Sequence, residues 1–210
     1  MVRERRVLVP FEVIAVLAIA IIWPRLTWSE LIPFSLPLLL AGSISRWLRG
    51  RTWADVSTGG ADRMAIGAIA GAAALVLAIV AGTPIVELLA NRAVEWSQYG
   101  AVRGNVTQIV VFAIYVGIAA LAAELALRGW IVERMLELAP GPPVLPILVG
   151  ALAEALLVPG GVGVRIGAAA FGIGLGWIYV AGGRSVVAPI CARVVFAVGA
   201  LLLDGFQLIG

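Results

Sequence analysis

Four charged residues in the second half of the chain lie inside stretches that are otherwise apolar. Glu124 and Arg128 share the segment Ala-Ala-Glu-Leu-Ala-Leu-Arg-Gly, Glu154 follows Gly-Ala-Leu-Ala, and Arg193 follows Pro-Ile-Cys-Ala. A charge near the centre of a bilayer costs about 2.5–3.5 kcal/mol, so such residues usually face the interior of a helix bundle. We therefore predict that these four side chains converge within one bundle.

The spacing of these residues leaves two interpretations open. Glu124 and Arg128 are four residues apart on one helical face, so they could form a self-neutralising ion pair at the end of a span. They could equally belong to a larger site. Glu154 and Arg193 have no partner nearby in the sequence, and we predict that they pair with each other through bidentate Arg–carboxylate geometry.

The composition argues against a zinc site. Zinc in proteins is bound by Cys, His and carboxylate side chains, whereas carboxylates alone suit harder cations. The chain has no His and one Cys, which leaves Glu124, Glu154 and at most Cys191 in this region. Arg193 would also bring a positive charge that repels a metal. We therefore predict no bound zinc, no other cofactor and no metal-dependent peptidase activity.

The elements that must position these residues are membrane helices. The chain has 210 residues, of which 62% are hydrophobic and 13% charged, against about half and a quarter in soluble domains. A span needs about 20 mostly apolar residues. We predict an all-α, polytopic transmembrane bundle of about seven (six to eight) spans. The expected spans are about 8–23, 31–47, 64–81, 106–121 with a more polar continuation to 138, 144–158, 164–181 and 186–203.

The first hundred residues add helices and some ambiguity. We expect N-terminal transmembrane helices in 1–105 and a helical core in 106–210, within one membrane domain. The stretch 84–98 is either an interfacial helix or an extension of the third span. The first span has the basic n-region of a signal peptide, but no small-residue cleavage site follows, which favours a retained span. Two glycine pairs indicate close helix contacts, within one bundle or at a dimer seam: Gly67 with Gly71, and Gly172 with Gly176.

The placement of arginine predicts the orientation. Cytoplasmic loops carry an excess of basic residues. Such residues precede the first span and separate the second from the third: Arg3, Arg5, Arg6, Arg46, Arg49, Arg51 and Arg63. We expect the N-terminus in the cytoplasm, in a bacterial cytoplasmic membrane. A net charge of +3, with scattered basic residues, is too small for a nucleic-acid surface. The expected partners are the lipid bilayer and other membrane protein subunits.

From Val106 to Leu203 the sequence resembles the CPBP intramembrane metalloproteases, which include CAAX prenyl proteases and bacteriocin-processing proteins. The family has Glu-Glu-x-x-x-Arg, then Phe-x-x-x-His, a Gly-rich helix, a Gly/Arg-Ser turn and Pro-Ile-x-x-His-x-x-x-Asn. The corresponding segments here are Ala123–Gly129, Gly150–Glu154, Phe171–Gly176, Gly183–Ser185 and Pro189–Ala197. The chain resembles a divergent member of this family that lacks the catalytic histidines.

The departures from the family concern its catalytic centre. The resemblance implies a centre built from the Glu pair, two His and the Asn, of which this chain keeps Glu124, beside Arg128. Glu154 and Arg193 replace the two His. This pattern favours a pseudoenzyme that serves as a structural or binding subunit of a membrane complex. An intramembrane protease with an altered centre on Glu124 and Glu154 is the alternative. A small transporter is a third hypothesis, against which stands the lack of an evident inverted repeat.

Overall fold

The computed structural model describes residues 8–23, 26, 32–56, 59–90, 102–139, 141–158 and 161–208, and the secondary-structure elements within them are helices. This confirms the all-α fold class. The elements are α2 (Val9–Ile22), α3 (Ser35–Leu48), η2 (Trp53–Asp55), α4 (Ala61–Leu77), η3 (Ala78–Gly82), α5 (Thr83–Ala90), α6 (Val106–Ala126), η5 (Leu127–Val132), α7 (Glu133–Leu138), α8 (Val144–Leu157), α9 (Val162–Ala181) and α10 (Val187–Gly205).

Helix length separates two groups of elements. Among the described residues, four continuous helices are long and apolar enough to cross a membrane, namely Ala61–Ile85, Val106–Leu138, Val162–Ala181 and Val187–Gly205. The helices α2, α3 and α8 have 14 residues each. At 1.5 Å per residue each covers about 21 Å, less than the roughly 30 Å of a hydrocarbon core. The protein is thus an integral membrane helix bundle in which apolar helices occur where spans were expected, four of them at full length.

The ambiguous stretch after the third span extends that span. The elements α4, η3 and α5 follow one another without a break, and η3 is a π-helical segment inside this helix. Thr83–Ala90 is therefore a continuation of the third span and not a separate interfacial helix. The remainder of the stretch, residues 91–98, lies outside the described residues.

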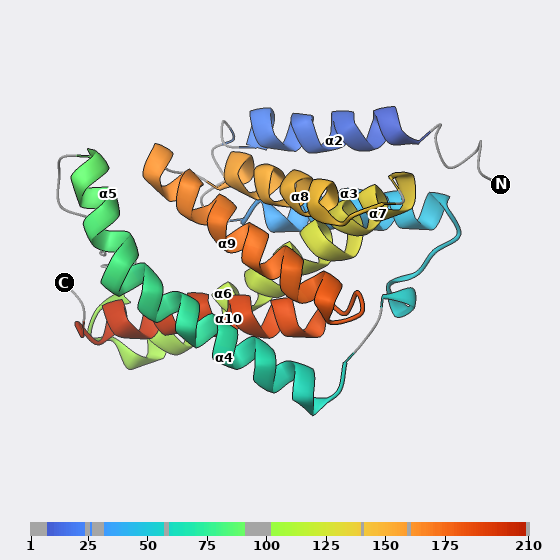
Figure 1. Ribbon diagram of the computed structural model, residues 1–210. Coiled ribbons are helices and arrows are strands. Elements are labelled where there is room, and N and C mark those ends of the chain that lie inside the picture. The colour runs from blue at the N-terminus through green and yellow to red at the C-terminus, as the bar shows by residue number, and fades with distance from the viewer. Residues whose placement is uncertain are drawn as a thin grey trace.

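The helices pack across the midpoint of the chain. The helix α4 contacts α10, α6 contacts both α10 and α3, and α8 contacts α9. Figure 1 shows α2 along one side of the molecule and α4 with α10 along the other. Contacts of α3 with α6 and of α4 with α10 join the N-terminal helices to the C-terminal ones. The division into 1–105 and 106–210 stays a prediction.

Ion pairs show which helix ends meet. Arg134 of α7 donates to Glu12 of α2 at 2.8 Å, so α2 begins at the end of the bundle where α7 ends. At the opposite end, Arg103 before α6 donates to Asp204 near the end of α10, also at 2.8 Å. These two pairs place the start of α2 beside the end of the long helix, and the start of α6 beside the end of α10.

The two glycine pairs lie at helix contacts within the chain. A Cβ added at Gly67 or Gly71 of α4 would lie 2.2 Å from a backbone carbonyl oxygen of α10. Gly172 and Gly176 of α9 face α8, where an added Cβ would come within 2.8 Å of a side chain. Contact at this distance is possible only without a Cβ, which is how small residues bring membrane helices together. The interpretation as packing within one bundle agrees with these contacts.

We predict that Gly71→Ala lowers the thermal stability of the purified protein in detergent. The added methyl group would overlap the carbonyl oxygen of Ala192, and such overpacking typically costs about 1–3 kcal/mol. Gly117→Ala in α6 is the matched control, because a Cβ there would meet no atom within 4 Å. Thermal unfolding followed by circular dichroism measures the difference. Equal midpoints for both variants would contradict the proposed role of Gly71.

Candidate functional site

Four side chains form a closed cluster that we call the charge ring: Glu124, Arg128, Glu154 and Arg193. Arg128 donates from Nη1 to Glu124 at 3.0 Å and from Nη2 to Glu154 at 2.9 Å. Arg193 donates from Nε to Glu124 and from Nη2 to Glu154. Each carboxylate thus contacts both guanidinium groups. The predicted convergence is confirmed, and the two predicted pairs are parts of one arrangement.

The charge ring is buried and electrically neutral. The side chains of Glu124, Arg128 and Glu154 are at most 1% exposed, whereas that of Arg193 is 13% exposed. Two carboxylates and two guanidinium groups sum to zero charge, which reduces the cost of placing them among apolar helices. The guanidinium group of Arg193 also lies over the ring of Phe171, 5.4 Å from its centroid, where a cation–π interaction adds to the ion pairs.

Several helices position the ring. Glu124 comes from α6, Glu154 from α8 and Arg193 from α10. Arg128 lies on the π-helical segment η5, inside the long helix that α6 begins. Such π segments are rare and often occur at functional sites. The sequence does not reveal this one, because its residues, Leu-Arg-Gly-Trp-Ile-Val, also occur in ordinary membrane helices.

The helix α9 completes the ring through its backbone. Arg128 donates from Nη2 to the carbonyl oxygen of Gly172 at 2.8 Å. A Cβ at Gly172 would lie 2.8 Å from Glu154 Oε2, so a side chain here would displace the carboxylate. Sequence reasoning identified Gly172 only as a packing residue. Its second role depends on the position of a helix that is distant in sequence.

The residues of the ring do not fit a zinc ion. Three of the four carboxylate oxygens accept hydrogen bonds from arginine, and Glu124 Oε2 is left without a partner among the described residues. The chain has no His. Cys191 lies on the other side of α10, since an added Cβ at Gly67 of α4 would lie 2.8 Å from its Cβ. One carboxylate oxygen between two guanidinium groups is a poor donor set for zinc.

A second cluster of two acids and two arginines lies at one end of the bundle, and we call it the terminal cluster. It consists of Glu12, Arg49, Arg134 and Glu137. Glu12 accepts from Arg134 at 2.8 Å, and Glu137 accepts from Arg49 at 2.9 Å and from Arg134 at 3.2 Å. Sequence reasoning missed this cluster. Glu12 could have indicated it, because Glu12, like Glu154, is an acidic residue inside an otherwise apolar stretch.

The fold and the charge ring together define the class of protein: an all-α membrane helix bundle with a buried site assembled from several helices. Residues 105–199, which include the whole ring, match the family model described as type II CAAX prenyl endopeptidase Rce1-like. This match supports the resemblance to the CAAX prenyl proteases over the second half of the chain. Comparisons with curated proteins and with solved structures found no match to the chain.

We predict strong energetic coupling between Glu154 and Arg193. Glu154→Leu or Arg193→Met alone would leave an uncompensated buried charge, which costs about 3–5 kcal/mol. The double variant keeps the neutral Glu124–Arg128 pair, so it should lose much less stability than the two single variants summed. A double-mutant cycle on thermal stability in detergent measures this coupling.

The control for this cycle combines Glu154→Leu with Arg165→Met. Arg165 is exposed near the start of α9 and is not part of the ring. The effects of these two changes should simply add. If the Glu154 and Arg193 changes also add within error, the ring does not act as a unit.

Proposed function

We propose that this CAAX protease-like membrane protein is proteolytically inactive and acts as a structural or binding subunit of a membrane complex. The observation that carries the proposal is the contact of Arg193 with both Glu124 and Glu154. The resemblance implies a His where Arg193 stands. A catalytic metal site needs several protein ligands and one position open to water or substrate. Here the guanidinium groups occupy the space and the hydrogen-bonding capacity that such a metal would use.

The outer surface of the bundle supports a binding role within the membrane. Large apolar side chains are exposed along α2 and α4, among them Phe11, Ile14 and Ile69, each more than 60% exposed. In a bilayer these faces contact lipid tails or the helices of another protein. The short helices α2 and α3 do not reach across a hydrocarbon core by themselves, so a neighbouring subunit beside them would complete the apolar belt.

One observation favours the alternative of an altered carboxylate centre. Glu124 Oε2 is buried and has no hydrogen-bond partner among the described residues. A carboxylate oxygen in that condition could accept a proton from a water molecule during hydrolysis. Glu124 is nevertheless held through its other oxygen by Arg128 and Arg193, which also occupy the space beside the carboxylate.

Affinity purification in mild detergent tests the proposal. We expect a stoichiometric partner protein, no stoichiometric zinc and no cleavage of prenylated peptides. The double variant Glu154→Leu with Arg193→Met should keep the partner, because it leaves the bundle neutral and packed. Stoichiometric zinc, or peptide cleavage that this double variant abolishes, would show that the protein is an enzyme.

A positive control can be built in the same chain. Changing Ala123→Glu, Glu154→His, Arg193→His and Ala197→Asn would supply the residues that the family resemblance implies. Zinc bound by this variant would show that the metal analysis detects a site in this fold. If this variant binds zinc and the wild-type protein does not, the difference is due to the residues of the ring and not to an insensitive measurement.

We infer that the end of the bundle with the terminal cluster faces the cytoplasm of a bacterial cell. Arginines of the described residues gather at this end: Arg46, Arg49, Arg51, Arg63, Arg134 and Arg184. The opposite end of the described helices has Arg103 and Arg165. An excess of basic residues marks the cytoplasmic side. Arg3, Arg5 and Arg6, on which the sequence argument also depended, lie outside the described residues.

Alkaline phosphatase fusions in a bacterial host test this orientation, because that enzyme is active only outside the cytoplasm. A fusion after Gly50, at the arginine-rich end, should be inactive. A fusion after Gly104, at the opposite end, should be active. Activity of the first fusion and not of the second would reverse the orientation.

A further inference from the structure

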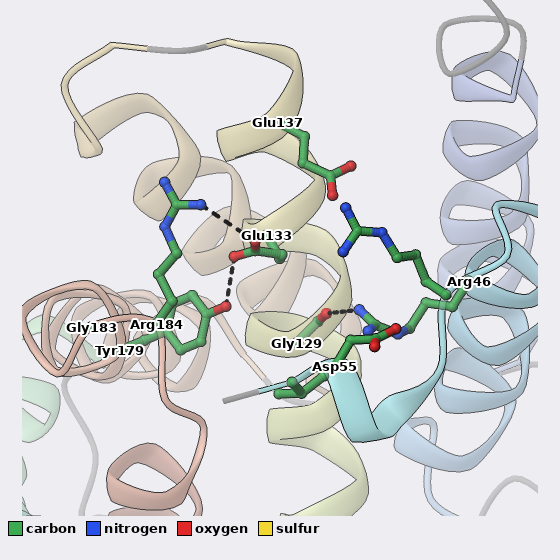
Figure 2. A pocket seen from close by; sticks show the side chains of 10 residues that line it. Arg46, Asp55, Gly129, Glu133, Glu137, Tyr179, Gly183 and Arg184 are labelled. Atoms are coloured by element: carbon green, nitrogen blue, oxygen red, sulfur yellow. Dashed lines mark hydrogen bonds and ion pairs between the residues drawn. The ribbon is translucent and has the colours of Figure 1, made fainter. Parts of the chain in front are cut away.

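A cavity of about 240 Å³ lies at the arginine-rich end of the bundle, separate from the charge ring. Figure 2 shows side chains from α3, α7 and the turn between α9 and α10 around it. Arg46 and Tyr179 are buried and form its floor, whereas Arg51 and Arg184 are exposed at its mouth. The cavity therefore connects a buried guanidinium group to the outside of the protein.

The guanidinium groups around the cavity have unused hydrogen-bonding capacity. Arg46 is 5% exposed and donates to the carbonyl oxygens of Gly129, at 3.1 Å, and Thr52. Its buried Nε has no partner among the described residues. Arg51 forms no ion pair within the described part of the chain. An unsatisfied buried N–H group is costly, and a bound acceptor would remove that cost.

The acids that line the cavity are already engaged. Glu133 accepts from the Tyr179 hydroxyl at 2.7 Å and lies 3.4 Å from Arg184. Glu137 is neutralised by Arg49 and Arg134 of the terminal cluster, which do not line the cavity.

Asp55 is the remaining acid at the mouth. It accepts from the backbone N–H of Thr52 at 2.6 Å, and this bond lowers the pKa of Asp55. With the terminal cluster neutral, three arginines face two acids, which leaves one positive charge: Arg46, Arg51 and Arg184 against Asp55 and Glu133.

We propose that this cavity binds a phosphate group, from the headgroup of an anionic lipid or from free phosphate. Guanidinium forks match the oxygens of phosphate, and basic pockets between helix ends on the cytoplasmic side suit lipid headgroups. The volume is below the roughly 300–1,000 Å³ of sites for drug-sized ligands, which suits a single headgroup. The cavity lies where α3 and α9 end, at the level at which headgroups meet a membrane protein. The proposal does not depend on the loss of proteolysis.

Binding of soluble probes to the full-length protein in detergent tests the proposal. The probes are dihexanoyl phosphatidylglycerol, dihexanoyl phosphatidylcholine and inorganic phosphate, titrated while thermal stability is measured. We expect a saturable rise in the unfolding midpoint with an anionic phosphate probe and a weaker response to phosphatidylcholine, whose choline adds a cation. Arg51→Gln should weaken binding about tenfold, the loss expected for one charge-assisted hydrogen bond.

Matched variants make the result specific. Arg165→Gln removes the same charge from an exposed position near the start of α9, at the other end of the bundle, and should leave the affinity unchanged. Arg46→Gln would also remove two hydrogen bonds to the backbone and could unfold the protein. Arg184→Gly is the better second variant, because Arg184 has a φ of 63° that glycine adopts without strain.

The probes also distinguish the source of the phosphate group. Stabilisation by phosphatidylglycerol alone identifies a lipid headgroup, and equal stabilisation by inorganic phosphate identifies free phosphate. The proposal is overturned if neither probe gives a saturable shift. It is equally overturned if Arg51→Gln and Arg184→Gly bind as tightly as Arg165→Gln.

Discussion

Charge neutrality inside an apolar bundle is the constraint on which the rest of this structure depends. Isolated charges cannot stay ionised among lipid-embedded helices, so each carboxylate of the charge ring faces two guanidinium groups. Those contacts require α6, α8 and α10 to approach one another closely. They also require α9 to present the Gly172 carbonyl without a side chain. The glycines at the helix contacts are therefore needed for the charge ring to form as well as for the helices to pack.

A second neutral arrangement of acids and arginines lies at the end of the bundle. Two acids and two arginines of the terminal cluster join α2 and α3, which are too short to span a bilayer, to the last turns of the long helix that α6 begins. All 15 basic residues of the chain are arginine. A planar guanidinium group can donate to two carboxylates at once, which the compact ammonium group of lysine does less well. Two arginines and two acids are therefore enough to pair every charge in each cluster.

The helices and the convergence of the ring could be predicted from sequence because both follow from lipid exclusion. Apolar runs locate the helices, and charges such as Glu154 inside those runs must face one another. Three features had no such signal. The π segment around Arg128 is a shift in backbone hydrogen bonding, and the amino-acid composition of the segment does not indicate it. Arg134, which donates to Glu12, is 122 residues away in the sequence. The cavity proposed to bind phosphate is lined by both Arg46 and Tyr179, and these residues lie near each other only because of how α3 and α9 pack.

If proteolysis is lost as proposed, the charge ring would hold the helices together without a metal. Glu124 and Glu154 together have two negative charges, which a divalent cation would balance. Arg128 and Arg193 supply the same two positive charges from within the chain. The electrostatic requirement of the fold is then met without a bound ion, and the guanidinium groups cannot activate water as a metal does. Under the proposed loss of proteolysis, the stability of the bundle would no longer depend on the cation that catalysis needs.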